Sequence, residues 1–222
     1  MQVPKKIYDI TQPLFHNCPG YPGLEPTILT RSFQHSVHGF NAEILTINMH
    51  SGTHLDVPFH FFADGKALDQ FPIDTFAGPC VIFDLSKSVK PDSAITPEDL
   101  KPHMSSVSKG DIVLLHTGYG PKRGFSKEYL LEYPFVGGPA GEMLAEAGVK
   151  GVGTDALSIG GFGSPEKAAP GHLALLSKDI FLIEELLIPK ELLDGKKRFL
   201  TAFPLPVQGC SGALVRAVVM EF

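Results

Sequence analysis

The sequence lacks several features that define common classes of protein. It has no tryptophan and only three cysteines among 222 residues, at widely spaced positions without a Cys-x-x-Cys pair: Cys18, Cys80 and Cys210. An odd number of isolated cysteines argues against a disulfide framework and against a thiolate zinc site. We therefore expect free thiols in a reducing, cytoplasmic environment.

Long hydrophobic runs and basic stripes are also missing. No window of membrane-spanning length is free of charge, and the first residues lack the apolar stretch of a signal peptide. The formal net charge is −5, and the lysines and arginines are scattered apart from the run 196–198, which we interpret as a solvated turn. We expect neither a membrane nor a nucleic acid as a partner.

The material that is present suits one domain spanning residues 1–222. The chain is 43% hydrophobic, which allows a sizeable core, and its 23 glycines and 19 prolines are spread out rather than gathered in a linker. We find no internal repeat. The chain is therefore expected to form a single, loop-rich domain.

Short apolar, β-branched runs predict more strands than helices. We expect strands over 43–50, 80–85, 111–116, 150–154, 180–183, 198–203 and 213–220. We expect helices over 96–100, 139–147 and 172–177. Continuous runs such as 111–115, in which four apolar residues follow Asp111, indicate strands buried on both faces. The pattern favours an α/β or α+β domain with a mixed, partly closed sheet, and we take α/β as the fold class.

Residues 50–60 (HSGTHLDVPFH) carry the strongest functional signal. Three imidazoles and one carboxylate stand there at even positions: His50, His54, Asp56 and His60. A period of two is the side-chain repeat of an extended strand, so the four groups can share one face. Gly52 and Pro58 disfavour a helix. We expect a half-buried strand over 43–50, with odd-numbered apolar residues on its inner face, and then a loop that delivers the other three groups.

A one-faced group of three imidazoles and a carboxylate is typical of a metal site. Both ligand types suit zinc, manganese or iron, and two histidines with one aspartate leave coordination positions open for water and substrate. An open position indicates catalysis rather than a purely structural ion. A polar loop with chance histidines is the alternative, although nine histidines in the chain explain pairs better than this group of four.

The same residues resemble a known family. The pattern His-x-Gly-Thr-His-x-Asp-x-Pro-x-His of the cyclase family of metal-dependent hydrolases is matched at every fixed position from His50 to His60. This family includes bacterial kynurenine formamidases and isatin hydrolases. The resemblance covers most of the chain, including residues 21–23, 116–119, 153–156, 172–184 and 209–216.

The resemblance implies a set of metal ligands. His50, His54 and Asp56 would bind a first divalent ion, zinc or manganese. Asp56 would bridge to a second ion that is also held by His172 and Glu184, so one or two ions are implied. The resemblance further implies a swivelling β/β/α-type domain that assembles as a homo-oligomer, either a dimer or a tetramer.

The residues alone give weaker evidence for the two distant ligands than for the cluster. His172 follows the pair 170–171 at the start of an expected short helix, and Glu184 ends the apolar run 180–183. Each is by itself more typical of a surface or capping residue. Glu185 competes with Glu184, but successive strand side chains point in opposite directions, so only one of them can face a metal.

The expected reaction is hydrolysis of a non-peptide C–N bond in an amide, a formamide or a cyclic amide. A metal can bring the pKa of bound water toward neutrality and polarise the carbonyl. His60 would take the proton from water and pass it to the departing nitrogen, a role that the resemblance also implies. A role for His60 as a further metal ligand, or as a partner of one, stays open.

The aromatic residues near the motif suggest a small, aromatic substrate. Five of them could wall a pocket: Tyr21, Phe59, Phe61, Phe62 and Phe71. We select Tyr21, Phe59 and Phe71 as substrate-binding candidates. Formamidases often have tryptophan before Pro-Gly, where this chain has Tyr21, and this departure counts against formylkynurenine itself. Asp155 and His116 both end expected strands, and for both a structural role is favoured.

Three other functions compete with hydrolysis. A non-haem iron oxygenase would use His54, Asp56 and His172 as its triad, but this leaves His50 and His60 unexplained. A lyase or isomerase would use the same metal to stabilise an enolate while His60 moves a proton. A non-catalytic metal-binding module would have a closed coordination shell.

Overall fold

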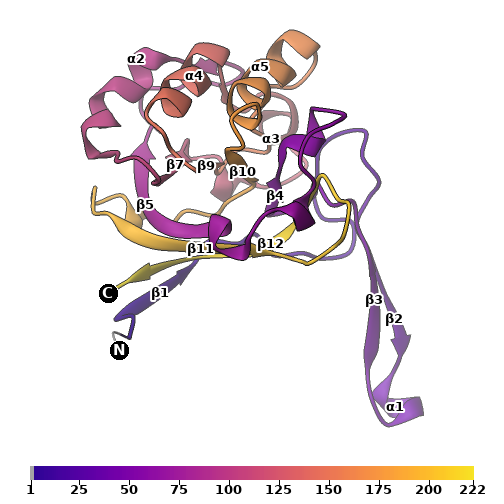
Figure 1. Ribbon diagram of the computed structural model, residues 1–222. Helices are drawn as coiled ribbons and strands as arrows, with labels where there is room; N and C mark the ends of the chain where they lie inside the picture. Colours follow the sequence, from indigo (N-terminus) through magenta and orange to yellow (C-terminus); the bar gives the residue numbers. More distant parts are fainter. Residues whose placement is uncertain (1–2) are drawn as a thin grey trace.

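The computed structural model describes residues 3–222 and is built around one mixed sheet (Figure 1). The strand order is β1-β12-β11-β5-β7-β9-β10-β4, and a further pairing of β4 with β12 closes seven of the eight strands into a barrel. The strands are β1 (Lys6–Asp9), β4 (His54–Asp56), β5 (Ala77–Asp84), β7 (Ile112–His116), β9 (Gly151–Thr154), β10 (Phe181–Glu184), β11 (Arg198–Pro204) and β12 (Gly212–Glu221). The α/β class and the mixed sheet are confirmed, and the pairing of β4 with β12 closes the barrel.

Both faces of the central strands are buried, as the continuous apolar runs predicted. The four strands from β5 to β10 are parallel to one another, whereas β4, β11 and β12 pair antiparallel with their neighbours. Along β7, Ile112 and Leu114 pack in the barrel interior. Val113 and Leu115 pack on the outer face, in a second core beneath the helices. Helices α2, α4 and α5 cover this side of the sheet (Figure 1).

The three helices expected from the sequence correspond to α2, α4 and α5, with α5 starting earlier than expected, whereas α3 was not predicted. Helices α2 (Pro97–Leu100), α3 (Lys127–Leu131), α4 (Gly138–Glu146) and α5 (Pro165–Leu176) are present, together with a short pair of strands, β6 (Ala94–Ile95) and β8 (Phe135–Val136). Helix α5 begins seven residues before the expected start at His172. Ser164 is its N-cap residue and Pro165 its first helical residue, and the helix continues through Pro170. A proline can be tolerated within a helix, at the cost of one backbone hydrogen bond. No helix within residues 3–222 is long and apolar enough to span a membrane.

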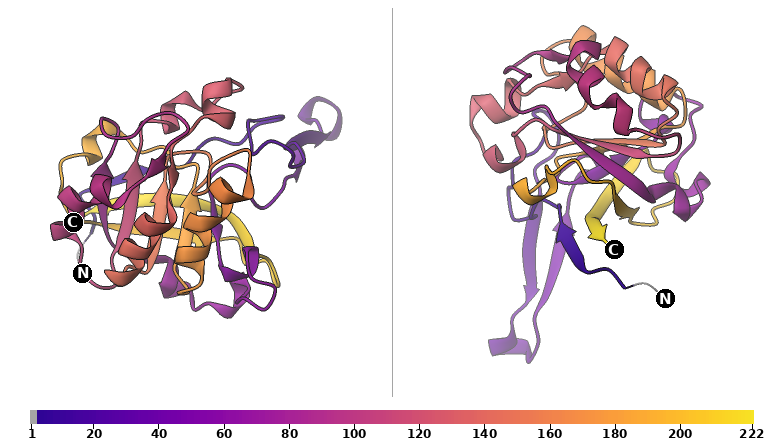
Figure 2. Two further views of the ribbon diagram at one scale, coloured as in Figure 1. Left: turned by 90° about the horizontal axis from the view of Figure 1, so that it is seen from above. Right: turned by 90° about the vertical axis from the view of Figure 1, so that its left-hand side faces the viewer.

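Residues 28–46, here called the hairpin arm, project away from the barrel (Figures 1 and 2). The arm consists of β2 (Ile28–Phe33), the short helix α1 (His35–His38) and β3 (Ala42–Thr46). The half-buried strand expected over 43–50 is therefore wrong: β3 ends at Thr46, and Leu45, on its expected inner face, is 44% exposed. Alternation reports an apolar face but not whether the chain's own core covers it.

Candidate metal centre and active site

Strand pairing brings the first ligand candidates together. His54 and Asp56 lie in β4, a short strand that takes the place of the predicted loop. In the antiparallel register of β4 and β10, His54 pairs with Glu184, so both side chains lie on the same face of the sheet. Leu55, between the two β4 ligands, points to the barrel interior instead. The site thus lies on the outer face of the barrel, on the side of α5.

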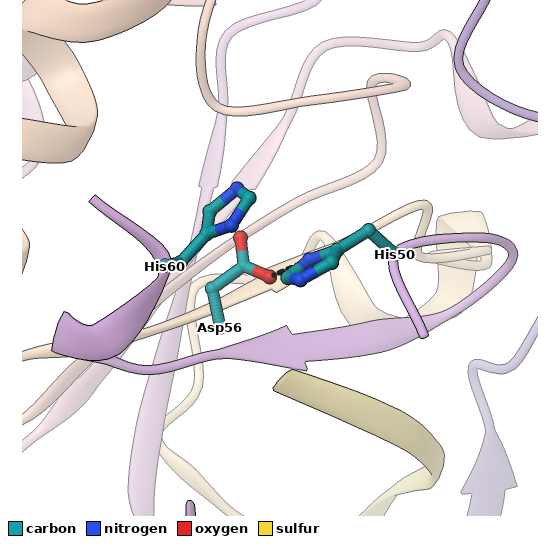
Figure 3. Close-up of side chains that lie close together, drawn as sticks. All are labelled: His50, Asp56 and His60. Atoms are coloured by element: carbon teal, nitrogen blue, oxygen red, sulfur yellow. Dashed lines mark hydrogen bonds and ion pairs between the residues drawn. The ribbon is translucent and has the colours of Figure 1, made fainter. Parts of the chain in front are cut away.

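His50, Asp56 and His60 form one compact group (Figure 3). His50 comes from the turn before β4, and His60 ends a single-turn 3₁₀ helix (Pro58–His60) that follows it. His50 Nδ1 lies 2.7 Å from Asp56 Oδ1, and the His50 and His60 rings stack with centroids 4.0 Å apart. One potential ligand atom from each residue lies within 4.8 Å of the others.

A second group shares the same aspartate. His54, Asp56 and Glu184 also place ligand atoms within 4.8 Å of one another, and all three residues are buried. His172 reaches this group from α5, with its Nε2 atom 3.2 Å from Glu184 Oε1 and 3.9 Å from Asp56 Oδ2. All six residues proposed from the sequence for the metal and the proton transfer therefore converge on one place, with Asp56 at the centre.

Hydrogen bonds fix the direction in which these ligand atoms point. His54 Nδ1 donates to the Gly52 carbonyl at 2.8 Å, and His172 Nδ1 donates to the Ala168 carbonyl at 2.8 Å. Each ring therefore directs Nε2 toward the carboxylates, the usual arrangement for a metal-binding histidine. Glu184 Oε1 accepts from the Ser158 hydroxyl and the Ile159 N–H, which holds the carboxylate in place.

The buried polar atoms of the cluster fit a divalent cation. His54 Nε2 and Asp56 Oδ2 are fully buried and have no hydrogen-bond partner in the described part of the chain. Burial opposes charge on His54, but the Asp56 and Glu184 carboxylates outweigh it and raise the His54 pKa to about 10. Burial would also raise the pKa of Asp56, but the neighbouring imidazoles hold it well below its usual range. A positive charge is therefore strongly favoured between these side chains.

Ser211 and Gly212 were not singled out from the sequence, yet both support the cluster. The Ser211 hydroxyl lies 2.8 Å from His50 Nε2. Gly212 pairs with Asp56 across β12 and β4, and a Cβ atom there would lie 2.4 Å from the Leu55 carbonyl and 2.8 Å from His50 Cε1. A single serine or glycine carries no distinctive pattern, so only the pairing of β12 with β4 identifies these positions.

Comparison with known proteins gives the same family as the motif. The family model described as "Putative cyclase" matches residues 8–160. Kynurenine formamidase from Bacillus cereus is 30% identical over 213 residues, which is 95% of each chain. The chain belongs to the cyclase family.

Solved structures of cyclase-type proteins resemble the whole chain. A "predicted metal-dependent hydrolase" from Bacillus stearothermophilus is 28% identical, covers 98% of both chains and has a TM-score of 0.79. Isatin hydrolase A from Labrenzia aggregata is 23% identical, covers 97% of this chain and 93% of its own, and has a TM-score of 0.84, which shows the likeness of fold. This member of the cyclase family is a metal-dependent hydrolase of non-peptide amide C–N bonds.

A cavity of about 230 Å³ opens beside the cluster of this cyclase-family chain. Its lining is mostly apolar and includes ligand candidates and pocket walls: His50, His60, His172, Glu184, Tyr21, Leu24, Phe61, Ser158, Gly160 and Ala168. Tyr21, one of the substrate-binding candidates, is therefore part of the cavity wall. The ring of Phe61 stacks on His172 with centroids 4.4 Å apart, which supports an aromatic wall near the candidate ligands.

Phe59 and Phe71 do not line this cavity, so their selection as substrate-binding residues needs correction. The 3₁₀ turn that directs His60 to the cluster leaves the Phe59 side chain partly exposed. Phe71 packs against the hydrophobic core, with its ring centroid 6.0 Å from that of Phe76. Phe61 lines the cavity instead.

Asp155 and His116 form a separate buried unit outside the cavity lining. The Asp155 carboxylate accepts hydrogen bonds from the Thr117 and Gly118 N–H groups at 2.7 Å and 3.0 Å. His116 Nδ1 lies 3.1 Å from Asp155 Oδ2. These contacts fix the turn after β7, which agrees with the structural role favoured from the sequence.

Proposed function

We propose that the chain hydrolyses a formamide carried by a single aromatic ring, releasing formate and an aromatic amine. The observation that carries this proposal is the position of Asp56, which is shared by two groups of ligand residues beside an apolar, partly aromatic cavity. The curated relatives at about 30% identity are kynurenine formamidases, which supports a formamide rather than a larger acyl group.

The size of the cavity supports a one-ring substrate. An apolar cavity of about 150 Å³ holds a benzene molecule, so the 230 Å³ beside the cluster has room for one ring and a formamide group. Tyr21 and Phe61 offer aromatic contacts to that ring. Tyr21 replaces the tryptophan that is common in formamidases, so we propose a substrate other than formylkynurenine.

One or two ions of zinc or manganese fit the mixed imidazole and carboxylate donors of the cluster. We assign a first ion to His50, His54 and Asp56, and a second to Asp56, His172 and Glu184. The ion supplies a water of lowered pKa and polarises the formyl carbonyl. The six residues therefore bring water, carbonyl and proton acceptor together in a small, largely apolar space.

His60 is the proton carrier of the proposed reaction. Burial lowers the pKa of its ring to about 4, against the opposing effect of Asp56, so the ring is neutral at pH 7. The water oxygen bonds to the formyl carbon and the C–N bond breaks. His60 takes the water proton and delivers it to the departing nitrogen, which leaves as the amine.

Metal analysis coupled to a substrate screen tests the proposal. The purified protein is stripped with a chelator, reloaded with zinc or manganese, and offered formanilides, isatin and cyclic imides while formate and ring-opened products are measured. Metal-dependent release of formate from formanilides is the expected result. Turnover of isatin or an imide alone would reassign the substrate to cyclic amides, and turnover of none of them would contradict amide hydrolysis by this site.

The His60→Ala variant separates a proton carrier from a ligand. We expect it to keep the metal content of the wild type and to lose about 10²–10⁴-fold in turnover, the usual contribution of a positioned acid–base group. His103→Ala is the matched control, because His103 stacks on Phe83 and is not among the cavity residues. Loss of metal in His60→Ala alone would make His60 a ligand instead.

We also propose that the protein is a cytoplasmic homo-oligomer. The hairpin arm exposes seven large apolar side chains: Ile28, Leu29, Phe33, Val37, Phe40, Ile44 and Leu45. A two-stranded hairpin is marginally stable by itself, so a second copy of the chain that covers this surface would stabilise both. The three free cysteines suit a reducing compartment.

A further inference from the structure

A buried ion pair between Arg123 and Glu185 lies next to the cluster of ligand candidates. Glu185, next to the ligand candidate Glu184, is 1% exposed and belongs to neither ligand group. Its Oε2 atom accepts hydrogen bonds from Arg123 Nε at 2.7 Å and from the Tyr129 hydroxyl at 3.2 Å, and the Arg123 side chain is itself 5% exposed. Burying two charges is costly, and the proposed reaction uses neither of them directly.

Hydrogen bonds connect Glu185 to the ring of His54. Glu185 Oε1 accepts from the Gly52 N–H at 2.9 Å, and the Gly52 carbonyl accepts from His54 Nδ1 at 2.8 Å. Gly52 has a φ of +69°, in the left-handed region that favours glycine, so its N–H and carbonyl are held in this unusual turn. The Thr53 hydroxyl adds a bond to the Glu185 carbonyl at 2.6 Å. Glu185 therefore holds the turn that orients His54 Nε2 toward Asp56.

The guanidinium of Arg123 extends the same network to the cavity wall. Arg123 Nη1 donates to the Pro13 carbonyl at 2.7 Å, and Nη2 donates to the Pro19 carbonyl at 3.0 Å. These two carbonyls bracket the segment that leads to Tyr21, a residue of the cavity lining. One planar group thus holds both ends of this segment and Glu185 at once, a geometry that a lysine cannot reproduce.

Backbone conformation supports the special position of Glu185. Its φ is +53°, which is uncommon for a residue with a side chain, and it immediately follows the last residue of β10. This turn lets the neighbouring glutamates face different partners, with Glu184 toward the ligand cluster and Glu185 toward Arg123. Strained backbone of this kind persists where the surrounding contacts demand it.

We propose that Arg123 and Glu185 are positioning residues, which fix His54 for the metal and the Tyr21 segment for the substrate at the same time. This inference rests on the proposed function for its substrate half and on the ligand cluster alone for its metal half. The pair would couple the orientation of the metal centre to the shape of the cavity.

Paired conservative variants test each half of the proposal. Glu185→Gln keeps the size of the side chain but leaves only one acceptor for Arg123 and Gly52, and Arg123→Lys keeps the charge but loses the three-way contact. Asp194→Asn and Arg198→Lys are the matched controls, because Arg198 forms a bidentate pair with Asp194 and its side chain is 4% exposed. The readouts are zinc affinity of stripped protein against a chromophoric chelator, kcat and KM for a formanilide, and the thermal midpoint.

The two variants should respond differently from the controls. We expect Glu185→Gln to weaken zinc binding by about 10–100-fold, as loss of a group that supports a metal ligand does. Arg123→Lys should raise KM by roughly 10-fold, more than it lowers kcat, because the cavity wall is displaced. The controls should change the thermal midpoint alone.

Zinc affinity and KM equal to the wild type in both variants, with only the thermal midpoint lowered, would overturn the inference. If Glu185→Gln does not fold, Arg123→Lys decides through KM, because an unchanged KM in that variant would overturn the substrate half of the inference. The zinc titration needs no substrate. A wild type that binds zinc without cleaving any formanilide would therefore count against the proposed function, whereas unchanged zinc affinities would count against this pair.

Discussion

The metal cluster and the hairpin arm reverse the usual distribution of side chains in opposite ways. The cluster buries carboxylates and imidazoles on the outer face of the barrel, with Asp56 completely covered. The arm exposes valine, isoleucine and phenylalanine far from the core, with Val37 75% exposed. Buried polar atoms without a hydrogen-bond partner, such as His54 Nε2 and Asp56 Oδ2, and exposed apolar patches are both unfavourable unless a bound partner compensates. The partner that we propose differs between the two regions: a cation for the cluster and a second copy of the chain for the arm.

Asp56→Asn should have the largest effect on metal content and turnover, and it tests whether a cation compensates the buried cluster. The variant removes the one carboxylate shared by both ligand groups, so we expect loss of bound metal and a fall in turnover of about 10³-fold or more, beyond the roughly 10–100-fold typical of a supporting residue. Elemental analysis and formate release measure the two effects. Asp84→Asn, at the exposed end of β5, is the control. Full metal content in Asp56→Asn would remove the basis for the metal assignment.

Removing the metal with a chelator should lower the Tm of the protein, and the size of this fall should not depend on the arm. A ligand at 1,000 times its dissociation constant stabilises the folded state by about 4 kcal/mol. For a chain of this size, that corresponds to a fall in Tm of roughly 8–16 °C when the metal is removed. Differential scanning calorimetry with and without chelator measures it. The same fall is expected in a variant with a polar arm, so a shift that depends on the arm would show that the two regions are coupled.

Polar substitutions in the arm test whether a second copy of the chain covers its apolar surface. We expect the double variant Phe40→Ser and Ile44→Lys to lower the solution mass from that of an oligomer to that of a monomer, because it removes apolar surface from the hairpin tip and from β3. Light scattering after size exclusion measures the mass, and metal content should stay unchanged. Phe125→Ser is the control, since Phe125 is 65% exposed but lies outside the arm. An identical mass for all three proteins would exclude the arm as the interface.

The sequence predicted the chemistry of the site better than its location. The even spacing of His50, His54 and Asp56 does place their side chains within reach of one another, but through a turn and the short strand β4 rather than one long strand and a loop. Strand β4 has only three residues, which is too short for a periodic pattern in the sequence. The pairing of His54 with Glu184 depends on a contact between residues 130 positions apart, which no local pattern encodes.

Burial was also predictable for the barrel and not for the arm. The run 112–115 is uniformly apolar, which favours a strand buried on both faces, and the structure agrees. The alternating residues of β3 predicted one buried face, yet Leu45 is exposed in the single chain. Phe59 and Phe71 show the same limit at smaller scale, because proximity in sequence to His60 did not decide which aromatic ring turns toward the cavity.

Labelling of the cysteine thiols should show the smallest difference between the two regions. It compares the stability of the base of the arm with that of the barrel and changes neither of them. Cys80 lies within β5 of the barrel, where burial raises its pKa to about 12, and Cys18 is buried at the base of the arm with its thiol 3.4 Å from the Thr27 hydroxyl. Cys210 is only partly buried. With an aromatic disulfide reagent at pH 8 we expect Cys210 to react first, Cys18 slowly through local opening, and Cys80 only on global unfolding. Mass spectrometry of the labelled peptides gives the order. Equal rates for Cys18 and Cys80 would mean that the base of the arm is as stable as the barrel, so that only the projecting strands need a partner.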